Sequence, residues 1–189
     1  MSQPSEEEIA GVTSYLFEIG TLKRARRSGW WIAGVRDPES IAEHSHRTAV
    51  LATILAAMEG ADPARACLLA TFHDTQETRL GDIPHIGRRY LTAATNEAVT
   101  ADQVAACPDA VAQTIQAAVA SHEAADNPEA LVARDADQLE CLLQAVEYRR
   151  TGNHNVQDWI DSCRTALKTA SATRIADAAL EMTTVEWRR

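Results

Sequence analysis

The chain has 189 residues, of which 46% are hydrophobic, and its 18 basic and 27 acidic residues give a formal net charge of −9. This length and hydrophobic content suffice to bury one sizeable core, so we expect a single domain spanning residues 1–189. The negative charge argues against broad nucleic-acid binding and against attachment to an anionic membrane surface. Glycine and proline are sparse, and no run alternates apolar with polar residues, which predicts an all-α fold.

The chain carries no visible targeting signal. Its N-terminal sequence MSQPSEEE is acidic and lacks the apolar segment of a signal peptide, and no apolar run is long enough to span a membrane. The spacing of the four cysteines, Cys67, Cys107, Cys141 and Cys163, matches neither a zinc ribbon nor a disulfide framework. We therefore expect a cytoplasmic protein whose cysteines are reduced thiols in the core.

Two capping boxes mark the starts of the first helices. Ser5 is followed three residues later by Glu8, and Ser40 stands in the same relation to Glu43. A serine hydroxyl at the first position and a glutamate carboxylate at the second satisfy backbone N–H groups that the helix leaves free. The two predicted helices cover residues 6–19 and 41–58, and they end at Gly20 and Gly60.

Further helices follow along the chain. Asp62 and Pro63 predict the start of a third helix, which carries ARACLLATFHD and leads into the polar stretch TFHDTQETRLGDIP. The sequence after GDIP is irregular. Later helices are predicted over residues 96–106, 109–122, 128–151 and 170–183, with Asn155 and Asp158 marking the cap of one more. Short loops between helices imply a bundle, and bundles commonly build metal and ligand sites in the core.

A histidine lies on the inward stripe of the helix over residues 41–58. That stripe consists of Ile41, His44, Thr48, Leu51, Leu55 and Met58. An imidazole on a buried face needs partners for both ring nitrogens, so His44 is either a hydrogen-bonded core histidine or a metal ligand. His46, two positions further on, points to the opposite face and is expected to be exposed.

The stretch after the third helix concentrates four ionisable side chains, those of His73, Asp74, Glu77 and Asp82. Adjacent His73 and Asp74 can converge on one cation only if the helix ends there and the backbone turns. One more helical turn would bring the carboxylate of Glu77 beside them. Because clustered carboxylates repel each other unless a cation or a shared proton intervenes, this pattern indicates a divalent metal.

The predicted long helix offers one more carboxylate for such a site. In the segment RDADQL, Asp135 shares a helix face with Leu139, while Asp137 shares one with Cys141. Periodicity alone does not choose between the two aspartates. Two imidazoles and two carboxylates suit manganese, iron, cobalt, nickel or zinc, and suit magnesium or calcium less because those ions prefer oxygen ligands alone.

These segments together resemble a known family. ESIAEHS, FHDTQETRLGDIP and RDADQLECLLQAVEY, with RRSGWW upstream and TGNHN downstream, resemble the HD-domain metal-dependent phosphohydrolases, most closely their 5′-deoxynucleotidase-like subgroup. The resemblance extends over roughly residues 15–168. It implies an HD-domain helical bundle with a metal site in its core, and a homodimer.

The resemblance also implies a role for each matching residue. The implied ligands of one divalent transition metal (Mn, Co, Ni, Fe or Zn) are His44, His73, Asp74 and Asp137. By the same resemblance, Glu77 assists proton transfer or orients the attacking water, and Asp82 contacts the sugar of the nucleotide. Arg27 is expected to hold the phosphate, because its planar fork matches two oxygens at once, and Trp30 to line the sugar pocket.

The implied activity is the removal of the 5′-phosphate from a (deoxy)nucleoside monophosphate by attack of a metal-bound water. Such a small phosphorylated substrate repels hydroxide, and a cation relieves this repulsion. Two alternatives stay open: hydrolysis of nucleotide di- or triphosphates or of a specialised metabolite phosphate, and a non-catalytic, metal-binding regulatory role. Branches of the wider family hold a second metal through additional histidines, but we expect His122 in ASHEA to lie on the surface.

Overall fold

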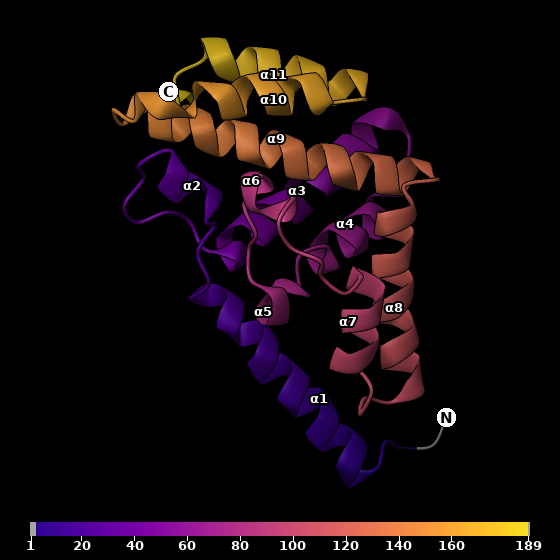
Figure 1. Ribbon diagram of the computed structural model, residues 1–189. Helices are drawn as coiled ribbons and strands as arrows, with labels where there is room; N and C mark the ends of the chain where they lie inside the picture. Colours follow the sequence, from indigo (N-terminus) through magenta and orange to yellow (C-terminus); the bar gives the residue numbers. More distant parts are fainter. Residues whose placement is uncertain (1–2, 189) are drawn as a thin grey trace.

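The computed structural model describes residues 3–188, which fold into a bundle of helices (Figure 1). Within those residues no strand is present, and one isolated bridge joins Arg26 to Ser40. The all-α prediction is therefore confirmed. The longer helices are α1 (Glu6–Ile19), α3 (Ile41–Glu59), α4 (Pro63–Phe72), α7 (Asn96–Gln103), α8 (Asp109–Ala124), α9 (Pro128–Arg150), α10 (Gln157–Ala166) and α11 (Ala170–Glu181). The short ones are α2 (Gly29–Ile32), α5 (Glu77–Leu80), α6 (His85–Arg88) and the 3₁₀ turns η1 (Gly20–Lys23), η2 (His154–Val156) and η3 (Glu186–Arg188).

Both predicted capping boxes are present. The hydroxyl of Ser5 accepts the backbone N–H of Glu8, whose carboxylate accepts the N–H of Ser5, and Ser40 and Glu43 make the same reciprocal pair. Gly60 ends α3 with a φ of 75°, a left-handed conformation that glycine adopts without steric cost. The starts of α1 and α3 therefore follow from local sequence.

Two details of the predicted helices are wrong. Met58 is 51% exposed, because residues 57–60 at the end of α3 extend past the core and are exposed on every side. Asn155 does not cap the helix that follows it. The chain first forms η2, whose cap is Asn153 with its side chain accepting the N–H of Asn155, and α10 starts directly after this turn.

Helix α9 runs through the centre of the bundle. It packs against α3 and α4 on one side and against α10 and α11 on the other (Figure 1). The largest apolar side chains in this core are buried almost completely; they include Leu55, Leu69, Leu139, Leu142 and Ile160. This packing brings the start of α3, the end of α4 and the middle of α9 together.

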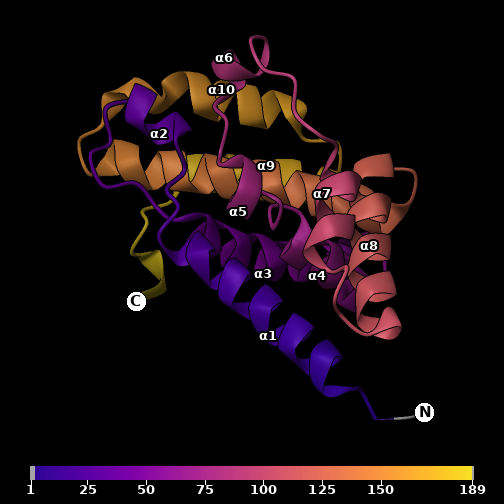
Figure 2. The same cartoon turned by 60° about the horizontal axis from the view of Figure 1, so that its bottom comes forward.

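Helix α1 lies along the outside of the bundle (Figure 2). Tyr15 packs there with Val104, Cys107 and Ile115 in a second, smaller apolar cluster. A side chain at Gly11 would place its Cβ 2.0 Å from the carbonyl oxygen of Ala106, so only glycine permits this close approach. The second cluster therefore fixes α1 against the segment between α7 and α8.

All four cysteines are free thiols, as predicted. Cys107 and Cys163 are buried, whereas Cys67 and Cys141 are half-buried and so lie at the edge of the core. Among the helices of residues 3–188, none combines the length and the apolar composition needed to cross a bilayer.

Glu18, near the end of α1, ties this helix to the segment that carries α5 and α7. Its carboxylate accepts hydrogen bonds from Arg79 at 2.7 and 2.8 Å, from the Thr78 hydroxyl at 2.8 Å and from the Gln103 amide at 2.9 Å. These contacts, that of Arg79 foremost, lower the pKa of Glu18 to about 2.

We expect Glu18→Gln to lower the free energy of unfolding at neutral pH by about 1–2 kcal/mol, a value limited by the partial exposure of the pair. Because the pKa is lowered in the folded state, the contribution is complete above the ordinary value of 4.5 and disappears as the pH falls towards 2. Denaturant titrations of both proteins from neutral pH downwards measure this. A difference that stays constant with pH would contradict the ion-pair explanation.

Candidate metal centre

Two histidines direct one ring nitrogen each towards the same point. His44 on α3 is fully buried, and its Nδ1 lies 2.5 Å from Oε2 of Glu140. His73 caps the end of α4, and its Nδ1 lies 2.7 Å from the carbonyl oxygen of Ala70. Because both Nδ1 neighbours are acceptors, each imidazole can keep a proton on Nδ1 and present the lone pair of Nε2 to a bound cation. The two Nε2 atoms are 3.3 Å apart.

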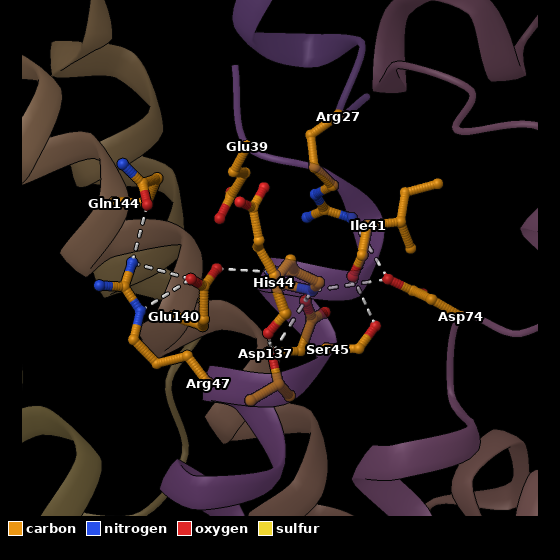
Figure 3. A network of polar contacts seen from close by, with 12 residues as sticks. Arg27, Glu39, Ile41, His44, Ser45, Arg47, Asp74, Asp137, Glu140 and Gln144 are labelled. Atoms are coloured by element: carbon orange, nitrogen blue, oxygen red, sulfur yellow. Dashed lines mark hydrogen bonds and ion pairs between the residues drawn. The ribbon is translucent and has the colours of Figure 1, made fainter. Parts of the chain in front are cut away.

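Two carboxylates lie beside these nitrogens. Oδ2 of Asp74 lies 3.2 Å from Nε2 of His73 and 3.5 Å from Nε2 of His44. Oδ1 of Asp137 lies 3.1 Å from Nε2 of His44 and 3.9 Å from Nε2 of His73. Figure 3 shows His44 between Glu140 on the left and Asp74 on the right, with Asp137 below it. The structure thus brings the four residues predicted as metal ligands together.

The electrostatics of this cluster favour a cation. Burial would raise the pKa of Asp74, but His73, Arg27 and His44 hold it well below its usual range. The pKa of Asp137 is likewise held low against burial, mainly by His44. The carboxylates in turn raise the pKa of both histidines, although burial opposes this. Two imidazoles and two carboxylates that attract positive charge fit one divalent transition metal.

The backbone break that this convergence requires occurs at His73. Helix α4 ends at Phe72, and the chain turns through residues 73–76 before α5 begins at Glu77, whose N–H donates to the carbonyl oxygen of Asp74 at 3.1 Å. Buried Gln76 anchors the turn by donating to the hydroxyl of Thr100 on α7 at 2.7 Å. The turn therefore allows the adjacent side chains of His73 and Asp74 to point at one site.

The structure separates the two aspartates between which periodicity did not choose. Asp135 is 2% exposed and faces away from the histidines, towards the start of α11. Its carboxylate accepts the N–H groups of Lys168 and Thr169 and the Thr169 hydroxyl, at 2.7–3.1 Å. Asp137 is the aspartate beside His44. Asp135 thus stabilises a helix start, and Asp137 belongs to the cluster.

A cation and a carboxyl group border the cluster. Arg27 is 17% exposed, and its NH1 lies 3.4 Å from Oδ2 of Asp74. Burial would lower the pKa of Arg27, but the nearby carboxylates raise it, so the guanidinium stays charged. Burial, together with Asp74 and Asp82, raises the pKa of Glu77. Oε2 of Glu77 is buried and has no hydrogen-bond partner within residues 3–188.

Asp82 and Trp30 connect loops around the cluster. One carboxylate oxygen of Asp82 accepts the backbone N–H of Ser28, and the Ser28 hydroxyl donates to the carbonyl oxygen of Asp82 at 2.7 Å. Trp30 is 2% exposed and donates its ring N–H to Glu39 at 3.0 Å. Its ring lies 5.8 Å from that of Trp159 on α10. These contacts hold Arg27 and Trp30 on one rigid wall.

A cavity of about 730 Å³ opens beside the cluster. Polar side chains of the predicted site line it, namely Arg27, Asp74, Glu77, Asp82 and Asp137. Its apolar lining includes Trp30, Ile32, Ile83, Ile86 and Trp159. A cavity with a charged cluster and an apolar wall fits a small molecule that joins a phosphate to a flat, less polar group.

The prediction that His122 lies on the surface is wrong. His122 is 8% exposed, and its ring lies 5.5 Å from that of His73. Helix α8 packs against α4 and α9, and His122 follows Ile115, Ala118 and Val119 along its buried face. Neither ring nitrogen has a hydrogen-bond partner among the described residues, and Nδ1 lies 3.8 Å from a carboxylate oxygen of Glu123. The helical spacing of these residues is the signal that was missed.

Sequence reasoning also missed Glu140 and Arg47. Glu140 follows Asp137 by three positions on α9, and Arg47 follows His44 by three positions on α3. Residues three apart share a helix face, so this spacing was a usable signal once α3 and α9 were taken as neighbours.

Comparisons with known proteins identify the family of this chain. The HD domain family model matches residues 19–178, and the chain belongs to that family. The 5′-deoxynucleotidase hdd1 of Schizosaccharomyces pombe is 30% identical over 75% of this chain and 74% of its own. The 5′-deoxynucleotidase HDDC2 of Mus musculus is 30% identical over 86% of this chain and 83% of its own.

A solved structure extends the comparison to the fold. The PH0347 protein of Pyrococcus horikoshii OT3 aligns with a TM-score of 0.76 at 26% identity, and the alignment covers 90% of this chain and 99% of that one. The predicted HD-domain bundle and the resemblance to the 5′-deoxynucleotidases are therefore confirmed.

Proposed function

We propose that this protein is a metal-dependent phosphohydrolase that removes the 5′-phosphate from deoxynucleoside monophosphates. The observation that carries the proposal is the convergence of two imidazole nitrogens and two carboxylates beside a half-buried arginine and an open cavity. The relatives named 5′-deoxynucleotidase support the class of substrate.

One divalent transition metal ion is held by His44, His73, Asp74 and Asp137. When bound, the ion supplies positive charge to the phosphoryl oxygens and acidifies water. Manganese, iron, cobalt, nickel and zinc all suit a ligand set of two imidazoles and two carboxylates.

Arg27 binds the phosphate. Only its NH1 is hydrogen-bonded to another described residue, Asp74, so its other N–H groups are available to phosphate oxygens in the cavity. A guanidinium matches two phosphate oxygens in a fork, which orients the phosphorus as well as binding it. Because the loop carrying Arg27 is tied to Asp82, this orientation is set before the substrate arrives.

Glu77 transfers the proton during the reaction. Glu77 lines the cavity beside Asp74, where its carboxyl group can orient a water and exchange a proton with it. The proton then passes to the departing 5′-oxygen of the nucleoside. Proton transfer by a positioned carboxyl group of this kind accelerates reactions by roughly 10²- to 10⁴-fold.

The apolar wall of the cavity receives the nucleoside. Trp159 and Ile86 offer surfaces for the flat base, and Trp30 lies against the sugar. The second carboxylate oxygen of Asp82, which Ser28 does not engage, accepts a sugar hydroxyl. The substrate therefore spans the cavity from Arg27 to Trp159.

Phosphate release from a panel of nucleotides tests the proposal. Chelator-treated protein, resupplied with each candidate metal in turn, should release phosphate from deoxynucleoside 5′-monophosphates. The corresponding 3′-monophosphates are matched controls with the same charge and base, and they should react far more slowly. Protein that binds metal but releases phosphate from none of these compounds, or that prefers di- or triphosphates, would overturn it.

A further inference from the structure

A polar network runs along the seam between α3 and α9, behind the metal ligands. It begins at Nδ1 of His44, the ring nitrogen that faces away from Asp74 and Asp137, with Oε2 of Glu140 at 2.5 Å. Glu140 is fully buried on α9. Its second oxygen, Oε1, accepts the Nε–H of Arg47 at 2.9 Å and forms an ion pair with NH2 of the same side chain at 2.8 Å (Figure 3).

Arg47 is itself held in place by α9. Its NH1 donates to both carboxylate oxygens of Glu147 at 2.9 and 3.0 Å, and its NH2 donates to the side-chain oxygen of Gln144 at 3.0 Å. Glu140, Gln144 and Glu147 follow one another at spacings of four and three residues, so they form one stripe of α9 facing Arg47. The network is thus fixed at both of its ends.

Filling the seam between two helices with charged side chains costs free energy. A buried carboxylate loses its hydration, and apolar side chains of similar volume often stabilise a core equally well or better. The hydrogen bonds and ion pairs that the Glu140 carboxylate makes within residues 3–188 go to His44 and Arg47. A role beyond packing explains why a charged group occupies this position.

We infer that Glu140 is a positioning residue for the metal centre, which acts by holding the Nδ1 proton of His44 so that Nε2 faces the metal. Without this acceptor, the proton of the neutral ring is free to occupy Nε2, which then cannot bind a metal. Arg47 keeps Glu140 oriented. Carboxylates behind metal-binding histidines fix the tautomer and raise the basicity of the ring in this way. The inference rests on the proposed role of His44 as a ligand.

Glu39 offers a competing explanation. The donor atoms of Glu39, His44 and Glu140 lie within 4.8 Å of one another, so they also form a possible cation site. The close contact between Nδ1 of His44 and Glu140 favours a shared proton over a second ion there. Metal stoichiometry separates the two explanations.

The tautomer of His44 can be measured in the unaltered protein. Long-range proton–nitrogen NMR spectra of the zinc-loaded protein should show a protonated Nδ1 on His44 and a metal-bound Nε2. The opposite assignment, with Nε2 protonated, would overturn the inference. This measurement needs neither turnover nor a variant that folds.

Glu140→Gln tests the effect on metal affinity. We expect a loss of about 10- to 100-fold in zinc affinity, measured by competition with a chelating dye below the unfolding temperature. Asp135→Asn is the matched control, because it changes another buried carboxylate on α9 that does not touch His44. Unchanged affinity in the Glu140 variant would overturn the inference. So would two bound zinc ions per chain in the unaltered protein, of which the variant loses only the second.

The two proposals fail in different ways. If the protein binds zinc through His44 in this geometry but releases no phosphate, the proposed function is wrong and the positioning role stands. If phosphate is released while Glu140→Gln keeps its zinc affinity, only the positioning role is wrong.

Discussion

Asp74→Ala and Asp137→Ala are each expected to remove metal binding and to lower phosphate release by about 10³-fold or more, because the cation supplies several kcal/mol of transition-state stabilisation. Both carboxylates lie within 3.5 Å of His44 Nε2, so each loss leaves an incomplete ligand set. Metal content and phosphate release of the purified variants measure the two effects. Either variant keeping both metal and activity would remove that aspartate from the proposed site.

Asp135→Ala is the control for this experiment, since Asp135 lies two residues from Asp137 on the same helix. We expect it to keep its metal and its activity, and to lose about 1–3 kcal/mol of unfolding free energy because N–H groups at the start of α11 lose their acceptor. The pair of variants therefore separates loss of function from loss of stability. Loss of metal in the Asp135 variant would mean that Asp137 was wrongly chosen over Asp135 as the metal ligand.

Glu77→Gln should lower kcat by roughly 10²- to 10⁴-fold while metal affinity stays unchanged. Glutamine has the same shape but neither accepts nor delivers a proton as a carboxyl group does. Oε2 of Glu77 is buried and has no hydrogen-bond partner among the described residues, so the substitution breaks no existing contact at that atom. Steady-state phosphate release and dye competition for zinc are the two measurements.

Glu123→Gln is a suitable comparison for the Glu77 variant, because Glu123 is a half-buried glutamate outside the 730 Å³ cavity. It should leave kcat close to that of the unaltered protein. If Glu77→Gln retained full turnover, Glu77 would not be the residue that transfers the proton. If it lost metal instead, Glu77 would be a ligand, and the proposed ligand set would be wrong.

The long helices could be predicted because the signals that mark them act over a few neighbouring residues and need no contact with distant parts of the chain. The capping boxes at Ser5 and Ser40 and the apolar stripe through His44 are satisfied within single helices. The short helices α2 and α6 were not predicted. A helix of four residues does not form on its own, so these turns depend on contacts from distant parts of the chain.

The metal site was only partly predictable, because it too depends on contacts between helices that are distant in the sequence. Periodicity assigns a residue to a face of its helix but does not say which helix lies opposite. Periodicity left Asp135 and Asp137 equivalent, and the contacts of α9 with α11 on one side and α3 on the other distinguish them. His122 was misplaced because its position on the apolar stripe of α8, in line with Ile115 and Val119, was not used. Glu140 was missed because its importance depends on a contact with another helix.

A stepwise addition of metal to metal-free protein, with phosphate release from a deoxynucleoside 5′-monophosphate measured after each addition, tests the metal site most directly. We expect a linear rise in phosphate release that levels off at one equivalent of metal per chain, because His44, His73, Asp74 and Asp137 form one site. Equal release without metal would contradict it. A rise that continues to two equivalents would also contradict it, and would make His122, beside His73, a candidate ligand of a second ion.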